Sequence, residues 1–237
     1  MSIRFRIGFC LLLGCLTVQP LCAAEIISVD DPVAAPIFDQ AKAKAGFWKL
    51  MQSFESQVDQ TYCGIASAVT VLNSLDVPAP PSPSIYPYRR FDEFNIFTEA
   101  VLAIKAPKVV HLGGLTLDEL GQVISSFGVR VDVHHADSPL DLDGFRTIAA
   151  AALTDPRTRV IVNFERKALG ESGEGHHSPL GAYDAITDRF LLLDVARYRL
   201  PPIWVSAADL WTAMNTEDTD GHAKRGFLVI HAEAGKE

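Results

Sequence analysis

The sequence predicts an α+β fold, in which a helical N-terminal half packs on a largely antiparallel sheet formed by the C-terminal half. Apolar residues recur at helical spacing in the first half, most clearly over residues 63–75 and 117–127. Beyond residue 160 the pattern changes to short apolar runs separated by turn residues such as Thr187 and Asp188. Helices and strands that are segregated along a chain in this way are typical of an α+β domain.

The individual elements follow from the same patterns and from their flanking residues. Helices are expected near residues 40–48, 63–75, 91–106, 117–127 and 142–153. Thr116 is a suitable N-cap for the fourth of these helices, and Gly128 closes it. A proline-rich turn over residues 77–84 follows the second helix. Strands are expected at residues 130–134, 160–164, 182–186, 190–195 and 226–231.

The first 24 residues are predicted to be a bacterial-type secretory signal. Arg4 and Arg6 precede an apolar run over residues 7–16, and small residues up to Ala24 form a cleavage site. The apolar run is too short to span a membrane, which needs about 20 residues. The expected location is the periplasm. As an alternative, the sequence LLGC at 12–15 resembles a lipobox, which would make the protein a lipoprotein anchored through Cys15.

Residues 25–237 are then expected to form one domain, long enough to bury a large core. The chain has 29 acidic and 21 basic residues, and its formal net charge is -8. An acidic surface argues against nucleic acid or an anionic membrane as a partner. An anionic substrate would therefore be bound by locally placed arginines.

Cys63 is the one cysteine left once the leader is removed, because Cys10, Cys15 and Cys22 all lie within it. It begins the predicted helix 63–75, where the partial positive charge of a helix N-terminus favours the thiolate. A buried cysteine that serves only as a small apolar side chain is the simpler explanation. An unpaired thiol in an oxidising compartment, however, favours a reactive role.

Two downstream residues complete a candidate catalytic set. His176 lies in the sequence GHHSP at 175–179, and Asp194 lies at the end of the strand-like run over residues 189–194. A cysteine, then a histidine, then an orienting carboxylate is the chain order of papain-like cysteine enzymes. The neighbouring His177 should point to the opposite face of a strand, so it is assigned a surface position or a supporting role.

Four segments together resemble the catalytic domain of phytochelatin synthase. They are QVDQTYCG at 57–64, VLNSL at 71–75, GHHSP at 175–179 and LDVARYRLPPIWV at 193–205. The resemblance continues through residues 210–215 and 225–227, and it is strongest to the short bacterial and cyanobacterial members of that family. This combination of segments is far more specific than the order of cysteine, histidine and aspartate alone.

The resemblance implies a papain-like fold that acts on glutathione. Cys63 would attack the Cys-Gly peptide bond, glycine would leave, and a γ-glutamylcysteinyl thioester would remain on the enzyme. His176 would be the general base, Asp194 would orient it, and Gln57 would help to bind the oxyanion. Arg166 and Arg225 fall where the family places arginines that bind the substrate carboxylate.

The fate of the acyl group is also an expectation from the resemblance. The cysteine-rich C-terminal segment of plant-type members has no counterpart before Glu237. Water is therefore expected to accept most of the acyl group, and a second glutathione to accept less. A papain-like peptidase acting on other periplasmic peptides is the alternative.

The sequence says less about cofactors, metal ions and protein partners. The other histidines lack metal-ligand spacing, so no intrinsic cofactor is expected and metal ions would enter as glutathione thiolate complexes. A periplasmic thiol or metal-binding protein is a second alternative, and stoichiometric metal retention would indicate it. The resemblance leaves a homodimer open.

Overall fold

Residues 24–232 are described by the computed structural model, and residues 1–23 of the predicted leader lie outside this range. Seven strands form one sheet in the order β1-β6-β5-β4-β3-β9-β2, and every neighbouring pair is antiparallel. These strands are β1 (Ile27–Ser28), β2 (Arg130–His135), β3 (Thr158–Glu165), β4 (Gly175–Asp184), β5 (Arg189–Leu192), β6 (Ile203–Ser206) and β9 (Gly226–His231). A separate ribbon is formed by β7 (Glu217–Asp218) and β8 (Ala223–Lys224).

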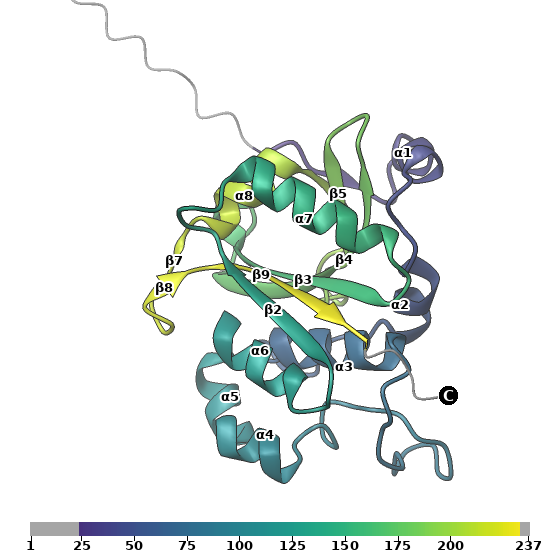
Figure 1. The fold of residues 1–237 in the computed structure, drawn as a ribbon, viewed down its shortest axis with the longest axis vertical. Coiled ribbons are helices and arrows are strands. Elements are labelled where there is room, and N and C mark those ends of the chain that lie inside the picture. The colour runs from purple at the N-terminus through teal and green to yellow at the C-terminus, as the bar shows by residue number, and fades with distance from the viewer. Residues whose placement is uncertain (1–23, 233–237) are drawn as a thin grey trace, which may run out of the picture.

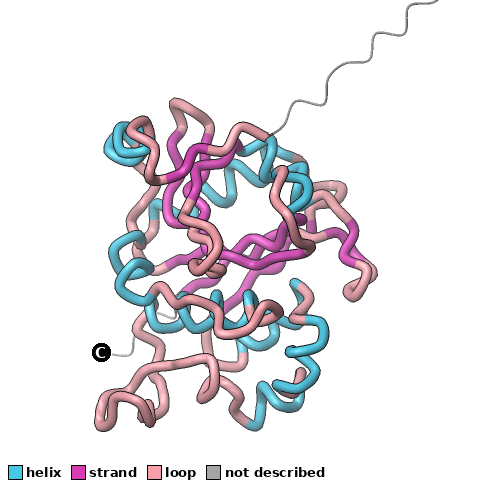
Figure 2. The backbone as a smooth tube through the Cα atoms, turned by 180° about the vertical axis from the view of Figure 1, so that it is seen from behind, coloured by secondary structure: helices cyan, strands magenta, loops and turns pink. Residues whose placement is uncertain are grey.

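Helices cover both faces of the sheet, which confirms the predicted α+β class (Figure 1). They are α1 (Ala34–Gln40), α2 (Phe47–Ser53), α3 (Cys63–Ser74), α4 (Glu99–Ile104), α5 (Pro107–Gly113), α6 (Leu117–Ser125), α7 (Leu142–Thr154) and α8 (Ala207–Met214). A short 3-10 helix, η1 (Arg166–Leu169), follows β3. In Figures 1 and 2, α7 and α8 lie on one side of the central strands, and α3 to α6 lie on the other. No helix within residues 24–232 has the length and apolarity needed to cross a membrane.

The sheet separates two hydrophobic cores, and β3 contributes to both. Val160, Val162 and Phe164 face the core under α7 and α8, whereas Ile161 faces the core under α3 and α6. Because successive side chains of a strand point to opposite faces, a strand with helices on both sides is apolar throughout. The next inward position on the α3 side is Asn163, which is buried and polar.

Helix α3 is buried along almost all of its length, and a buried guanidinium binds its C-terminal end. Arg159 Nη2 donates to the carbonyl of Ser74 at 2.8 Å, and Nε donates to the Ser74 hydroxyl at 2.8 Å. Its Nη1 donates to the carbonyls of Pro156 and Thr158. A positive charge at this end complements the helix dipole. Gly46 leaves room for it, since a Cβ there would lie 2.4 Å from Nη1.

The helix predicted at 117–127 is confirmed as α6, which ends two residues earlier than expected. Thr116 accepts a hydrogen bond from the backbone of Glu119, whose carboxylate accepts one from the Thr116 N–H. Gly128 has a positive φ of 79°, as the predicted helix stop requires. The helix predicted at 142–153 is confirmed as α7.

Two other predicted helices are wrong in extent. Most of the segment 40–48 is not helical, because Ala43 forms an isolated bridge with Tyr183 of β4. The carbonyl of Ala43 accepts the Tyr183 N–H at 2.8 Å. The segment 91–106 contains only the six-residue helix α4. Its start is occupied by a turn in which the Asp92 carboxylate accepts the N–H groups of Phe94 and Asn95, a local contact that competes with a helix.

Candidate active site

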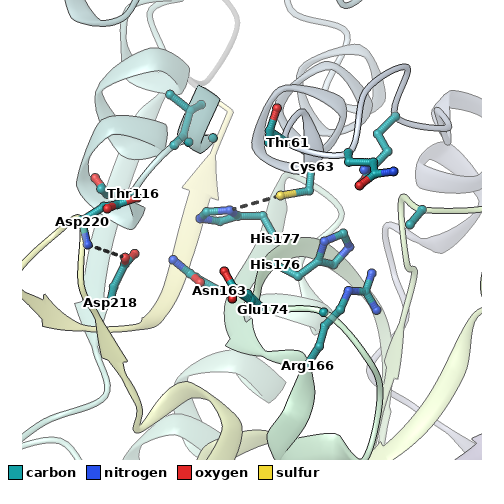
Figure 3. Close-up of a pocket in the computed structure, with 18 of the residues that line it drawn as sticks. Thr61, Cys63, Thr116, Asn163, Arg166, Glu174, His176, His177, Asp218 and Asp220 are labelled. Atoms are coloured by element: carbon teal, nitrogen blue, oxygen red, sulfur yellow. Dashed lines mark hydrogen bonds between the residues drawn. The ribbon is translucent and has the colours of Figure 1, made fainter. Parts of the chain in front are cut away.

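The thiol of Cys63 lies at the N-terminal end of α3, against the sheet (Figure 3). Cys63 is the first residue of the helix and is 6% exposed. The residue that follows it, Gly64, already lies close to Leu115, so a side chain there would crowd this end of the helix. The unpaired N–H groups of a helix N-terminus stabilise an anion there. The fold therefore positions the thiol where its ionised form is favoured.

His176 lies at the start of β4 and is joined to Asp194, just beyond β5. His176 Nε2 is 2.9 Å from Asp194 Oδ1, and both side chains are buried. Asp194 Oδ1 also accepts the backbone N–H of Ala196 at 2.7 Å. Burial favours the neutral acid, but the hydrogen bond and charge of His176, the charge of Arg166 and the N–H of Ala196 together outweigh burial and lower the pKa of Asp194 to about 2. Asp194 is therefore ionised throughout the neutral range and fixes the orientation of the imidazole.

The electrostatic surroundings of Cys63 and His176 favour the ionised form of each side chain. Burial raises the pKa of the Cys63 thiol, but the charge and hydrogen bonding of His176, with a further contribution from His177, lower it well below its usual value. Burial lowers the pKa of His176, but the Cys63 thiolate and Asp194 outweigh burial and raise it to about 9. These shifts favour a thiolate at Cys63 and an imidazolium at His176, the charge states that a cysteine nucleophile and its proton donor would need.

The surface position expected for His177 is wrong. His177 is 3% exposed, and its Nδ1 lies 3.8 Å from Cys63 Sγ (Figure 3). It pairs in register with Asn163, on the face of the sheet that packs against α3. His176 pairs with Phe164, on the other face. The alternation of strand faces was therefore anticipated correctly, but the face that contacts the helix N-terminus was not.

Arg166 is enclosed by two acidic side chains. Its Nη2 lies 2.7 Å from Asp194 Oδ2, and its Nη1 is bonded to Glu171 Oε2. Both ends of the guanidinium fork are therefore occupied by carboxylates of the protein. Sequence analysis missed Glu171, which has no motif of its own and becomes recognisable only through its buried ion pair with Arg166.

Gln57 is buried beside the nucleophile in the loop before α3. Its Nε2 donates to the carbonyl of Asp59 at 2.8 Å and to the Tyr198 hydroxyl at 3.2 Å. Its backbone N–H donates to Val195 O at 2.9 Å, one residue after the orienting aspartate. The amide is thus held in the wall of the cavity that Cys63 also lines, by contacts from both the helical half and the sheet.

A cavity of about 550 Å³ opens in front of these residues. Its wall contains Cys63, His176, His177 and Gln57, together with Arg225 from the segment before β9. The other polar wall residues include Asn163, Arg166, Glu174, Asp218 and Asp220. Its volume is in the range of sites that enclose a small molecule. Five of the six residues chosen from sequence therefore line one cavity, and the sixth, Asp194, lies behind His176.

Arg225 is bound more loosely than Arg166. Its closest polar contacts are Asn163 Oδ1 at 3.3 Å, Glu165 Oε2 at 3.4 Å and Asp218 Oδ2 at 3.5 Å. Gly175, the residue before His176, lets the guanidinium lie against the start of β4, because a Cβ there would lie 2.4 Å from Nη1.

Polar atoms without a partner are concentrated in this cavity. Among the described residues, the buried side-chain atoms that lack a hydrogen bond are Gln57 Oε1, Asn163 Nδ2, His177 Nε2, Arg225 Nε and Asp194 Oδ2. The first four belong to cavity-wall residues, and the fifth faces Arg166. Leaving a buried polar group unpaired costs about 1–3 kcal/mol, so such a cluster indicates a site completed by a ligand. Over residues 24–232, no group of three or more His, Cys, Asp or Glu side chains has metal-binding geometry.

Comparison with known proteins places this arrangement in a family. The family model for phytochelatin synthase matches residues 18–227. Glutathione gamma-glutamylcysteinyltransferase 2 of Arabidopsis thaliana is 34% identical over 207 residues, which cover 84% of this chain and 44% of the relative. The corresponding enzyme of Schizosaccharomyces pombe is 24% identical over 209 residues, covering 87% of this chain and 49% of the relative.

Glutathione gamma-glutamylcysteinyltransferase 1 of Lotus japonicus is 35% identical over 193 residues, which cover 80% of this chain. This chain spans 37% of that relative, and less than half of the other two. The similarity includes the segments that carry Cys63, His176 and Asp194, since the matched range contains all three. The chain belongs to the phytochelatin synthase family.

Proposed function

We propose that this protein cleaves the Cys-Gly bond of glutathione through a γ-glutamylcysteinyl thioester on Cys63. The observation that carries the proposal is one cavity whose wall contains Cys63 at the start of α3, the His176 that is bonded to Asp194, and several buried polar groups without partners. The arrangement supports a papain-like enzyme, because the nucleophile begins a helix of one half while its histidine and aspartate belong to the sheet.

Acylation follows from the resting ion pair. The Cys63 thiolate attacks the carbonyl carbon of the Cys-Gly bond, and the negative charge moves to the carbonyl oxygen. When this intermediate collapses, the C–N bond breaks and His176 gives its proton to the leaving glycine nitrogen. Asp194 keeps the imidazole oriented throughout, and the neutral His176 that remains can accept a proton in the next half-reaction.

Gln57 and the N–H of Cys63 are the proposed donors to the oxyanion. The N–H of Cys63 is at the helix N-terminus, and the Gln57 amide exchanges its contact with Tyr198 or Asp59 for the developing charge. A single donor of this kind is typically worth about 3 kcal/mol in the transition state.

The γ-glutamyl end of glutathione carries an α-carboxylate and an α-ammonium group, and the cavity wall offers a partner for each. Arg225 is assigned the carboxylate, because its contacts with protein acids are long and its Nε is unpaired. Asp218, 3.5 Å from Arg225, is assigned the ammonium group. For Arg166 the same carboxylate-binding role stays a prediction, since Asp194 and Glu171 occupy its guanidinium in the absence of substrate.

Water is proposed as the main acyl acceptor, so the principal products would be γ-glutamylcysteine and glycine. Phytochelatin would be a minor product that increases with glutathione concentration, and metal ions would act as glutathione thiolate complexes. Export to the periplasm, with a lipid anchor at Cys15 as the alternative, is proposed from the leader sequence.

The test is product analysis after incubation with glutathione, with and without cadmium or zinc. Release of glycine and γ-glutamylcysteine, together with an adduct of γ-glutamylcysteine on Cys63 in early-quenched samples, is the expected result. Cleavage of casein without turnover of glutathione would instead identify a general peptidase. Mass spectrometry of the mature N-terminus separates cleavage after Ala24 from lipid modification of Cys15.

A further inference from the structure

Arg199 lines the active-site cavity and is exposed to solvent. Its Nη2 donates to the carbonyl oxygen and to the hydroxyl oxygen of Ser172, and both of these partners are uncharged. The other arginines of the cavity wall, Arg166 and Arg225, each form ion pairs with acidic side chains. Within residues 24–232 no carboxylate forms an ion pair with Arg199, so its positive charge is not balanced by an acid of the described chain.

The guanidinium of Arg199 is held at one end and is open at the other. Ser172 binds Nη2, whereas Nη1 lies beside Gly173, which also lines the cavity. A Cβ at Gly173 would lie 3.4 Å from Nη1, so the glycine leaves this nitrogen uncrowded. The N–H groups of a guanidinium bind carboxylate oxygens well. Arg199 is therefore equipped to bind an anion that enters the cavity.

Arg199 lies on the same side of the nucleophile as His176. A side chain at Gly173 would touch Arg199 and also Arg166, whose Cδ would be 3.0 Å away. Arg166 is bonded to Asp194, and Asp194 is bonded to His176. The two arginines and the catalytic histidine thus belong to one continuous part of the cavity wall.

The groups assigned to the γ-glutamyl end lie on the other side of the nucleophile. In Figure 3, Asp218 lies to the left of the Cys63 thiol, whereas His176 and Arg166 lie to its right. In the proposed acylation, His176 protonates the leaving nitrogen of the Cys-Gly bond. The glycyl residue must therefore extend from Cys63 toward the His176 side, away from Asp218.

The spacing of the two ends fits a tripeptide. The guanidinium of Arg225 lies against Gly175, and that of Arg199 lies against Gly173. These two glycines are separated by at most about 7 Å of chain, and an extended tripeptide spans about 10 Å. The two carboxylates of glutathione can thus reach one arginine each while the Cys-Gly bond lies at Cys63.

We propose that Arg199 binds the glycyl carboxylate of glutathione, an inference that rests on the proposed function. Nη1 donates to this carboxylate, and the contact persists in the leaving glycine until it diffuses away. The enzyme would then select peptides that end one residue after the scissile bond. A longer peptide has an uncharged amide at this position, so it would lose the contact with Arg199.

The probe is the glycinamide analogue of glutathione, in which a neutral amide replaces the glycyl carboxylate. Release of γ-glutamylcysteine gives kcat/KM for both peptides with each variant. Arg199→Gln removes the charge, and Arg199→Lys keeps a charge without the planar fork. Arg157→Gln is the matched control, because Arg157 is exposed and precedes β3, at the opposite end of this strand from Arg166.

Wild type should prefer glutathione to the amide analogue by about 10-fold in kcat/KM, mainly through KM. This is the lower end of the range for a hydrogen bond to a charged group, because Arg199 is exposed to solvent. Arg199→Gln should lower kcat/KM for glutathione by about the same factor and leave the amide analogue within about twofold. Arg199→Lys should keep part of the preference, and Arg157→Gln should keep all of it.

Equal use of the two peptides by wild type would overturn the proposal. A preference that survives in Arg199→Gln would also overturn it and would assign the glycyl carboxylate to Arg166. If Arg199→Gln does not fold, Arg199→Lys carries the same comparison. Failure of the proposed function itself is distinguishable, because wild type would then release γ-glutamylcysteine from neither peptide.

Discussion

The two ends of helix α3 each carry a buried ionic group, and they differ in how completely that group is paired. At the C-terminal end, Arg159 donates to four acceptors and fills the space left by Gly46. At the N-terminal end, Cys63 faces a cavity in which neighbouring polar atoms lack partners. Both charges complement the helix dipole. The unpaired surroundings, rather than the buried charge, therefore distinguish the reactive end from the structural end.

Substitution at the N-terminal end should abolish activity and leave stability nearly unchanged. Cys63→Ser replaces the thiolate by a hydroxyl that is not ionised at neutral pH, so glutathione cleavage should fall by at least about 10³-fold. Glycine release and thermal unfolding measured on the same sample test both parts. Retention of a tenth of the activity would remove Cys63 from the mechanism.

Substitution of His176, the proposed proton donor near the N-terminal end of α3, should reduce activity almost as strongly. His176→Ala removes the group that stabilises the thiolate and protonates glycine, so turnover should fall by about 10²- to 10⁴-fold. The reactivity of Cys63 toward a small alkylating reagent at pH 7 should fall as well, because His176 is the principal group that lowers the thiol pKa. Undiminished alkylation would show that the helix N-terminus and His177 suffice to ionise the thiol.

Substitution at the C-terminal end of α3 should lower stability and leave activity nearly unchanged. Arg159→Met keeps much of the side-chain volume but leaves the Ser74 carbonyl and hydroxyl without their donor, at a cost of about 2–4 kcal/mol of unfolding free energy. Urea unfolding provides the measurement. Activity per folded molecule should stay within a few-fold of wild type. A catalytic defect without a stability defect would mean that the two ends are not separable.

A third buried charge, close to the N-terminal end, is expected to have a smaller effect that depends on pH. Glu93 accepts the Val58 N–H, and burial, with the nearby acids Glu55, Asp92 and Asp59, raises its pKa to about 7. Since the unfolded value is lower, at 4.5, the folded state binds the proton more tightly, and stability is lost as pH rises from about 4.5 to 7.

Glu93→Gln removes this loss and keeps an acceptor for Val58. It should therefore stabilise the protein at pH 8 by up to about 3 kcal/mol and have little effect at pH 4, as measured by urea unfolding at both values. Equal effects at the two pH values would show that Glu93 does not titrate in this range.

The sequence was sufficient to predict elements whose signals are local. Helix α6 is specified by its own capping residues, and the position of Cys63 at the start of an apolar helix was predicted correctly from the pattern of apolar residues. The segment 40–48 could not be predicted in the same way, because its backbone is determined by pairing with Tyr183 across the fold. The contact of His177 with the thiol depends on which face of β4 receives α3, and Glu171 is defined by a partner five residues away in a turn. Periodicity contains no information on either contact.

The position of β9 in the sheet has a consequence for how the protein folds. This strand is the last in sequence among the described residues, yet it lies between β2 and β3, which do not pair with each other. Without residues 226–231, β3 is left at the edge of a five-stranded sheet and β2 has no partner in it, and Arg225, which precedes β9, is not yet fixed. Such non-local pairing slows folding and leaves strand edges unpaired in folding intermediates. A chain in which β9 has not yet paired would thus carry Cys63 beside an incomplete cavity wall, and we expect cleavage activity to appear only when this strand inserts.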